Sequence, residues 1–252
     1  DHQSLLVALT VTALAANFAF VRTARPAWAW ASASLWGFAL WVSWFEPLVL
    51  LAAQELGRAI ALRKTAYPAV WRRGLLLTAS LALAAWAFEG FRNPWPDPVV
   101  REFFPRWAAL LGELQSAAPQ ALFAWTGWLL VPAPLLLAWS YGKTRDPLAL
   151  IVLLLLAVVT ALTGWQVRWN PWLVSVFCLA LPWILRPLAK PWLVWLVFVA
   201  SLWPVAAAWE ARTFPSRQDM ARRQEARAEA ALLTQTAEFL RSQPRGGVLA
   251  PW

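Results

Sequence analysis

Residues 147–164 read PLALIVLLLLAVVTALTG, eighteen positions without a charged side chain. An α-helix of this length rises about 27 Å, close to the roughly 30 Å thickness of the hydrocarbon core of a bilayer. This stretch therefore predicts a helix that crosses a membrane.

Comparable apolar runs recur along the chain of 252 residues, of which 60% are hydrophobic and 14% charged. Soluble domains average about 45–50% apolar and about 25% charged residues. The composition excludes a water-soluble enzyme and a disordered segment, and the single Cys178 excludes a disulfide scaffold. The 21 Trp residues suit the membrane–water interface. We expect an all-α, polytopic helical membrane protein of about eight transmembrane helices: 4–21, 27–45, 47–62, 74–88, 120–139, 147–164, 171–185 and 191–209.

Basic residues in the loops predict the orientation, because cytoplasmic loops are enriched in Lys and Arg. One set of alternate loops and span ends holds eleven Lys and Arg residues, and the loops on the opposite side hold four. The span 47–62 is short and polar, so a re-entrant or interfacial segment is its alternative. Only a true crossing keeps every basic cluster on one side. We therefore expect a multi-pass protein of the inner (cytoplasmic) membrane of a prokaryote, with residue 1, the loop 89–119 and residues 210–252 outside.

The composition changes after residue 209, which predicts two parts. Residues 1–209 form the transmembrane domain, whose outer loop 89–119 exceeds the length of about 12–15 residues above which loops are uncommon and usually functional or disordered. Residues 210–252 form an extracytoplasmic connection. Ser216 to Asp219 resembles a capping box, and the helix that follows to about residue 241 is solvated or, as the alternative, lies amphipathically on the membrane surface. It leads to a strand at Val248, where we expect a soluble domain truncated at Trp252.

No phosphate-binding loop, dinucleotide fingerprint or hydrolase motif occurs in the chain. One His and one Cys exclude a His-rich or thiolate metal cluster. Carboxylates with a hard divalent cation and arginines with an anion are the chemistry that remains.

Three outer-face positions are candidates for such chemistry. Asp1, at the entrance of the first span, is a metal ligand or a hydrated helix cap. Glu113, near the end of the long loop, is a catalytic or a merely solvated carboxylate. Arg168 lies between Trp165 and Trp169 at interface depth, where it binds an anion or extends toward the headgroups.

The order of these motifs resembles the catalytic subunit of oligosaccharyltransferases, which belong to the GT-C class of membrane glycosyltransferases. The shared features are Asp1-His2-Gln3 at the start of a span, Glu113-Leu114-Gln115 in a long outer loop, Gln166-Val167-Arg168-Trp169 after a later span, and a strand ending in Trp. The resemblance implies transfer of a glycan from a polyprenyl-pyrophosphate carrier to an acceptor protein Asn on the outer face.

The resemblance also implies roles for individual residues. Asp1 and Gln3 would bind Mn²⁺ or Mg²⁺, with His2 as a further possible ligand. Glu113 would be the catalytic contact to acceptor or metal, and Arg168 would bind the lipid pyrophosphate. Trp252 would begin the acceptor-binding motif. The expected partners are a lipid-linked sugar donor, an acceptor polypeptide and the lipid bilayer, but no nucleic acid.

Some features depart from this family. Four spans, where the family usually has six, separate the acidic motif from the long loop. Gln3 stands where many members have a second His. The family's first-loop Asp would precede residue 1, so we expect an internal fragment that is inactive alone. Two alternatives stay open: another GT-C transferase that uses a polyprenyl-phosphate sugar to modify lipid or protein, and a non-catalytic transporter or scaffold module.

Overall fold

The structure is a computed structural model that describes residues 2–61, 69–90, 111–188 and 190–242. Within these ranges all regular structure is helical and no strand occurs. The α-helices are α1 (His2–Thr23), α2 (Pro26–Val42), α3 (Phe45–Ala61), α4 (Ala69–Phe88), α6 (Pro119–Thr126), α7 (Ala133–Thr144), α8 (Pro147–Trp165), α9 (Asn170–Leu185), α10 (Pro191–Ser201), α11 (Trp203–Thr213) and α12 (Arg217–Ser242). Three short 3₁₀ helices are η1 (Gly112–Leu114), η2 (Trp128–Leu130) and η3 (Val167–Trp169).

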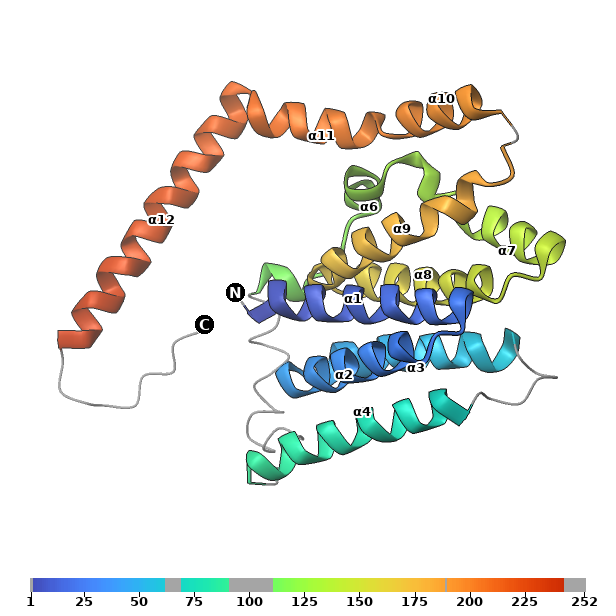
Figure 1. Ribbon diagram of the computed structural model, residues 1–252. Coiled ribbons are helices and arrows are strands. Elements are labelled where there is room, and N and C mark those ends of the chain that lie inside the picture. Colours follow the sequence, from blue (N-terminus) through green and yellow to red (C-terminus); the bar gives the residue numbers. More distant parts are fainter. Residues whose placement is uncertain (1, 62–68, 91–110, 189, 243–252) are drawn as a thin grey trace.

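Helices α1 to α4 and α7 to α9 form a bundle in which sequence neighbours run antiparallel (Figure 1). Helix α2 lies between α1 and α4, and α8 packs against α3, α7 and α9. Helices α10 and α11 run along the far edge, and α12 extends away from the bundle. The main core combines buried residues of α1, α2, α3, α7, α8 and α9.

Helix α8 contains the apolar stretch 147–164, for which the sequence predicts a membrane-crossing helix most clearly. Pro147 occupies its first turn, and the Asp146 carboxylate accepts the backbone N–H of Leu148 at 3.0 Å, which caps the helix. It ends at Trp165, because Gln166 adopts an extended backbone. Three segments of the described chain are long and apolar enough to cross a membrane: Gln3–Thr23, Pro147–Trp165 and Pro191–Thr213. The helical fold is confirmed, whereas the count of eight crossings stays a prediction.

Small and hydroxyl side chains join the helices, as expected where helices associate in lipid. The Ser32 hydroxyl of α2 donates to the Ala13 carbonyl of α1 at 2.9 Å, and Thr78 of α4 donates to the Ala33 carbonyl of α2 at 3.0 Å. Gly57 lets α3 approach α8 so closely that a Cβ there would lie 2.9 Å from the Cα of Ile151. These contacts fix α4, α2 and α1 as one layer and α3 with α8 as another.

The predicted span 120–139 is not one helix. Helix α6 ends at Gly127, whose φ is +79°, and η2 precedes α7. A side chain on Gly127 would collide with the carbonyl of Ser201 at the end of α10. The break therefore accommodates the junction of α10 and α11. That junction divides the predicted span 191–209 at Leu202, followed by Pro204 near the start of α11.

The loops rich in Lys and Arg gather at one end of the bundle, here called the basic end: residues 22–25, 143–146 and 186–190. The Arg22 guanidinium lies 5.1 Å from the ring centre of Trp183. The Trp183 indole donates to Asp146 at 2.8 Å, and Arg186 lies 3.8 Å from the same carboxylate. This grouping agrees with the predicted loop pattern, while the identification of this end as cytoplasmic stays a prediction.

The predicted polar helix to residue 241 is present as α12, Arg217–Ser242. The strand at Val248, Trp252 and most of the long loop lie outside the described residues.

Candidate functional site

Arg168 lies in η3, at the end of the bundle where α1 begins, here called the Arg168 end. The turn is held by the chain after η1. The Val167 N–H donates to the Gln115 carbonyl at 2.9 Å, and the Ala117 N–H donates to the Gly164 carbonyl at 3.3 Å. The Glu113 segment is thereby fixed beside the Arg168 turn, although more than 50 positions separate them in the sequence.

Aromatic packing holds η3 against the bundle. Trp169 is fully buried, with its ring centre 5.8 Å from that of Phe45 and 5.5 Å from that of Trp172. Trp172 in turn donates its indole N–H to the Thr10 hydroxyl of α1 at 3.1 Å. The backbone beneath Arg168 is therefore anchored to α1, α3 and α9 at once.

The Arg168 guanidinium forms an ion pair with the carboxylate of Glu46 in the first turn of α3. Ser43 donates its hydroxyl to the other Glu46 oxygen at 2.6 Å. The Glu46 side chain is 2% exposed and that of Arg168 is 36% exposed. Desolvation lowers the pKa of Arg168 from its usual range, and the buried carboxylate offsets part of this effect by favouring the charged form. The guanidinium has five N–H donors, so its exposed side can still bind an anion.

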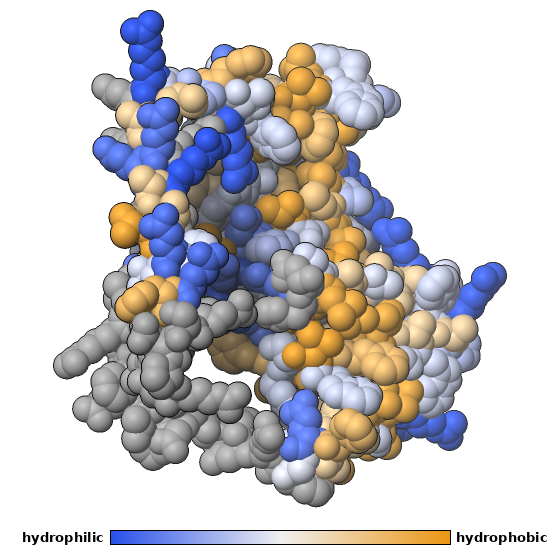
Figure 2. All heavy atoms as spheres, turned by 90° about the vertical axis from the view of Figure 1, so that its left-hand side faces the viewer, coloured by the Kyte–Doolittle hydropathy of each residue, from blue (hydrophilic) through white to orange (hydrophobic). Residues whose placement is uncertain are grey.

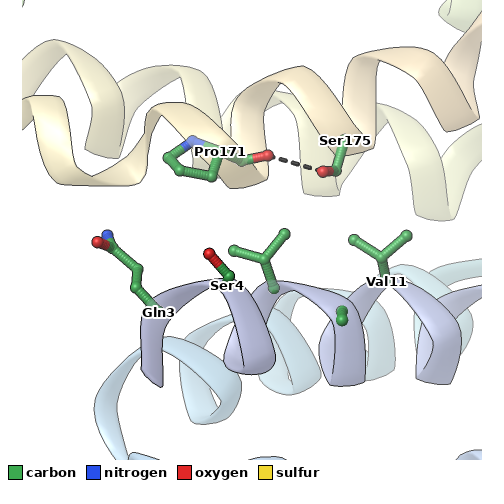
Figure 3. Close-up of a pocket in the computed structure, with 7 residues that line it drawn as sticks. Gln3, Ser4, Val11, Pro171 and Ser175 are labelled. Atoms are coloured by element: carbon green, nitrogen blue, oxygen red, sulfur yellow. Dashed lines mark hydrogen bonds between the residues drawn. The ribbon is translucent and has the colours of Figure 1, made fainter. Parts of the chain in front are cut away.

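Gln3, in the first turn of α1, donates its side-chain amide to the Arg168 carbonyl at 3.3 Å. It stands at the mouth of an open groove of about 430 Å³ between the first halves of α1 and α9 (Figure 3). Gln3 and Ser4 line the groove near its mouth, and Val7, Ala8 and Val11 follow along α1. Across from them lie Pro171, which follows Arg168 by three positions, and Ser175, which donates to the Pro171 carbonyl at 2.7 Å. The α1 wall of the groove is polar near Arg168, at Gln3 and Ser4, and apolar farther along the bundle, whereas the α9 wall carries the Ser175 hydroxyl opposite Val11.

Figure 2 shows the molecule from the Arg168 end. Hydrophilic side chains occupy a recess near the middle of this face, and apolar side chains cover the flank beside it. A polar centre beside an apolar flank is the arrangement that suits a ligand with a charged head and a hydrocarbon tail.

The structure thus brings Gln3 and Arg168 into contact and places η1 beside them. Glu113 itself is exposed in η1, and His2 is the first residue of α1. Asp1 and Trp252 lie outside the described residues. In the described ranges, no three or more His, Cys, Asp or Glu side chains are grouped so that they could hold a metal ion. The predicted metal site therefore depends on Asp1, with Gln3 able to add one amide oxygen.

Two residues of this site were not singled out from the sequence, Glu46 and Ser43. Glu46 is an acid in the first turn of an apolar helix, a position that is costly for a charge without a partner. This cost could have identified Glu46 from the sequence, because it requires a cation nearby. Arg168 is the single basic residue of the turn between α8 and α9. Comparison of the chain with protein-family models, curated proteins and solved structures finds no match.

Proposed function

We propose that this protein is a membrane glycosyltransferase that moves a glycan from a polyprenyl-pyrophosphate carrier to an Asn of an acceptor protein on the outer face. The observation that carries the proposal is the meeting of three distant segments. Gln3, Arg168 and the η1 turn with Glu113 lie together at one end of the bundle, and Gln3 also lines a groove whose α1 wall becomes apolar.

The groove fits the chemistry of a lipid-linked donor. A carrier chain would lie along Val7 and Val11, and its phosphates would meet the exposed side of Arg168. Negative charge develops on the pyrophosphate as the bond to the sugar breaks. A cation held rigidly by Glu46 and by the packing of Trp169 stabilises that charge without having to reorganise.

Glu113 supports the acceptor half of the proposal. Its carboxylate is exposed, and its segment is tied to the Arg168 turn by the bond between Gln115 and Val167. It would accept a hydrogen bond from the acceptor amide beside the donor. A divalent cation, Mn²⁺ or Mg²⁺, would be held by oxygen atoms of Asp1 and Gln3, which suit a hard ion. When bound, it would stabilise negative charge on the leaving phosphate.

The test uses the full-length protein, reconstituted in liposomes. A lipid-linked oligosaccharide, an Asn-x-Ser/Thr peptide and Mn²⁺ are supplied, and glycopeptide is measured by mass spectrometry. We expect transfer by the unaltered protein and loss of at least a hundredfold in Arg168→Ala, Glu113→Gln and Asp1→Ala. Arg72→Ala, an exposed cation of α4 remote from the site, is the matched control and should retain full activity.

Two results would contradict the proposal. Full transfer by both Arg168→Ala and Glu113→Gln would show that these residues do not form the active site. Transfer only from a polyprenyl-monophosphate sugar would instead favour the other GT-C reaction. Folding of every variant is checked by thermal unfolding in detergent, so that an unfolded variant is not counted as an inactive one.

A further inference from the structure

A second groove lies between the same two helices, at the opposite end of the bundle. It has a volume of about 470 Å³ and separates the last third of α1 from the last half of α9. Ala15 and Ala19 line it on α1, and Leu179 and Pro182 line it on α9. Ala15 and Ala19 both lie toward the surface of the bundle. Their side chains are small, so they leave the groove open.

The mouth of this second groove carries an excess of positive charge. Arg22 lines the groove, with its guanidinium 5.1 Å from the ring centre of Trp183. Arg186 lies one turn beyond Pro182, and its side chain is 54% exposed. Arg22 therefore lines the groove itself, and Arg186 lies beside it, because both cations approach the pair of Trp183 and Asp146 where α1 and α9 end.

The acidic group of these loops neutralises the cations only in part. The three loops of the basic end contain six Lys and Arg residues and one carboxylate, Asp146. One Asp146 oxygen caps α8 by accepting the Leu148 N–H, and the other accepts the Trp183 indole at 2.8 Å. Asp146 thus offsets at most one cation, Arg186 at 3.8 Å.

We propose that the second groove binds an anionic phospholipid of the leaflet at the basic end, with an acyl chain along Ala15 and Ala19 and its phosphate between Arg22 and Arg186. The length agrees, because Ala15 to Arg22 covers about 10 Å of helix, most of one leaflet of about 15 Å. Basic pockets between helices are a known way of binding acidic headgroups. This site is independent of the proposed transferase reaction, because it lies at the other end of the bundle from Arg168.

The test is native mass spectrometry of the full chain after removal of lipid in detergent, titrated with phosphatidylglycerol or phosphatidylcholine. We expect phosphatidylglycerol to bind at least tenfold more tightly. In the variant Arg22→Gln/Arg186→Gln its affinity should fall about thirtyfold, since each basic side chain near a membrane surface contributes about a fivefold change. The control Arg25→Gln/Lys143→Gln removes the same charge from the same end but outside the groove, and should change affinity less than threefold.

A second variant protects the test against misfolding of the first. Ala19→Trp fills the groove while keeping both arginines, and should also abolish the preference for phosphatidylglycerol. Cys178, the single cysteine of the chain, lines the groove and is exposed. Phosphatidylglycerol should therefore slow its alkylation by N-ethylmaleimide in detergent by several fold.

Three outcomes would overturn the proposal: equal affinity for the two phospholipids, an affinity that neither variant changes, or an equal loss in the control variant. Displacement of phosphatidylglycerol by a neutral polyprenol would also overturn it, since the groove would then belong to a carrier chain.

Discussion

The guanidinium of Arg168 donates to the carboxylate of Glu46, which lies 122 positions earlier in the chain. The pair connects the short turn between α8 and α9 with the first turn of α3. Because the Glu46 side chain is 2% exposed, its charge depends on Arg168 and on the Ser43 hydroxyl for stabilisation. The arginine that we propose to bind the donor is thus also a structural partner, and its two roles have to be separated by experiment.

Arg168→Ala should lower stability by about 2 kcal/mol, because the buried Glu46 carboxylate loses its charged partner. The magnitude stays below that of a fully buried pair, since Arg168 is 36% exposed. Thermal unfolding in detergent measures the effect.

Glu46→Gln in the same background provides the control. The double variant Glu46→Gln/Arg168→Ala no longer contains a buried unpaired carboxylate, so it should recover at least half of the lost stability. If it also remains inactive, Arg168 acts in transfer itself. A double variant less stable than Arg168→Ala would contradict the pairing.

Glu113→Gln should leave the unfolding temperature unchanged, within an equivalent of about 0.5 kcal/mol, because its side chain is exposed. Under the proposed function the same variant loses transfer activity, measured as glycopeptide formed. Gln120→Glu in α6, an exposed position of similar size, should change neither quantity. A large loss of stability in Glu113→Gln would assign this residue to the fold instead.

The helical fold could be predicted because apolar length alone identifies segments such as 147–164. The break at Gly127 could not, since it depends on the carbonyl of Ser201, 74 positions later. A hydropathy pattern reports how much of a segment suits lipid, whereas a break in the helix is decided by what packs against it. For the same reason the predicted span 120–139 became α6, η2 and α7.

For the candidate site, the sequence could predict at which end of the bundle its residues lie, but not how they contact one another. Alternating spans require Gln3 and Arg168 to emerge on the same side, and the structure adds the bond between the Gln3 amide and the Arg168 carbonyl. The Glu46 partner was missed because its helix was interpreted through its basic residues and its short length. Pairing between separate turns depends on how α3 packs against α8, which leads into the η3 turn, and local sequence does not encode that packing.

A buried polar cluster near the basic end should be a strong determinant of stability. Arg58 of α3 is 2% exposed, donates to the Asn17 side chain of α1, and lies 3.7 Å from the ring centre of Trp71 in α4. Trp71 in turn donates to Glu55 at 2.9 Å. Arg58→Met keeps most of the volume but removes the charge, and we expect a loss of about 3 kcal/mol in thermal unfolding.

The matched control for this cluster is Arg72→Ala, since Arg72 follows Trp71 directly but is exposed. It should change stability by less than about 0.5 kcal/mol. Equal unfolding temperatures for Arg58→Met and Arg72→Ala would show that the cluster contributes nothing beyond its charge.

Two glycine substitutions should have opposite effects, and they test the break between α6 and α7. Gly127→Ala places a side chain at φ +79° and against the Ser201 carbonyl, so we expect a loss of about 3 kcal/mol from backbone strain and overpacking together. Gly142→Ala lies inside α7 with nothing within 4 Å of the new Cβ. It should raise stability by about 0.5–1 kcal/mol, because alanine restricts the unfolded chain and favours the helix. Unfolding temperatures in detergent compare the two, and a tolerated Gly127→Ala would mean that α6 continues without a break and that α10 does not pack against it.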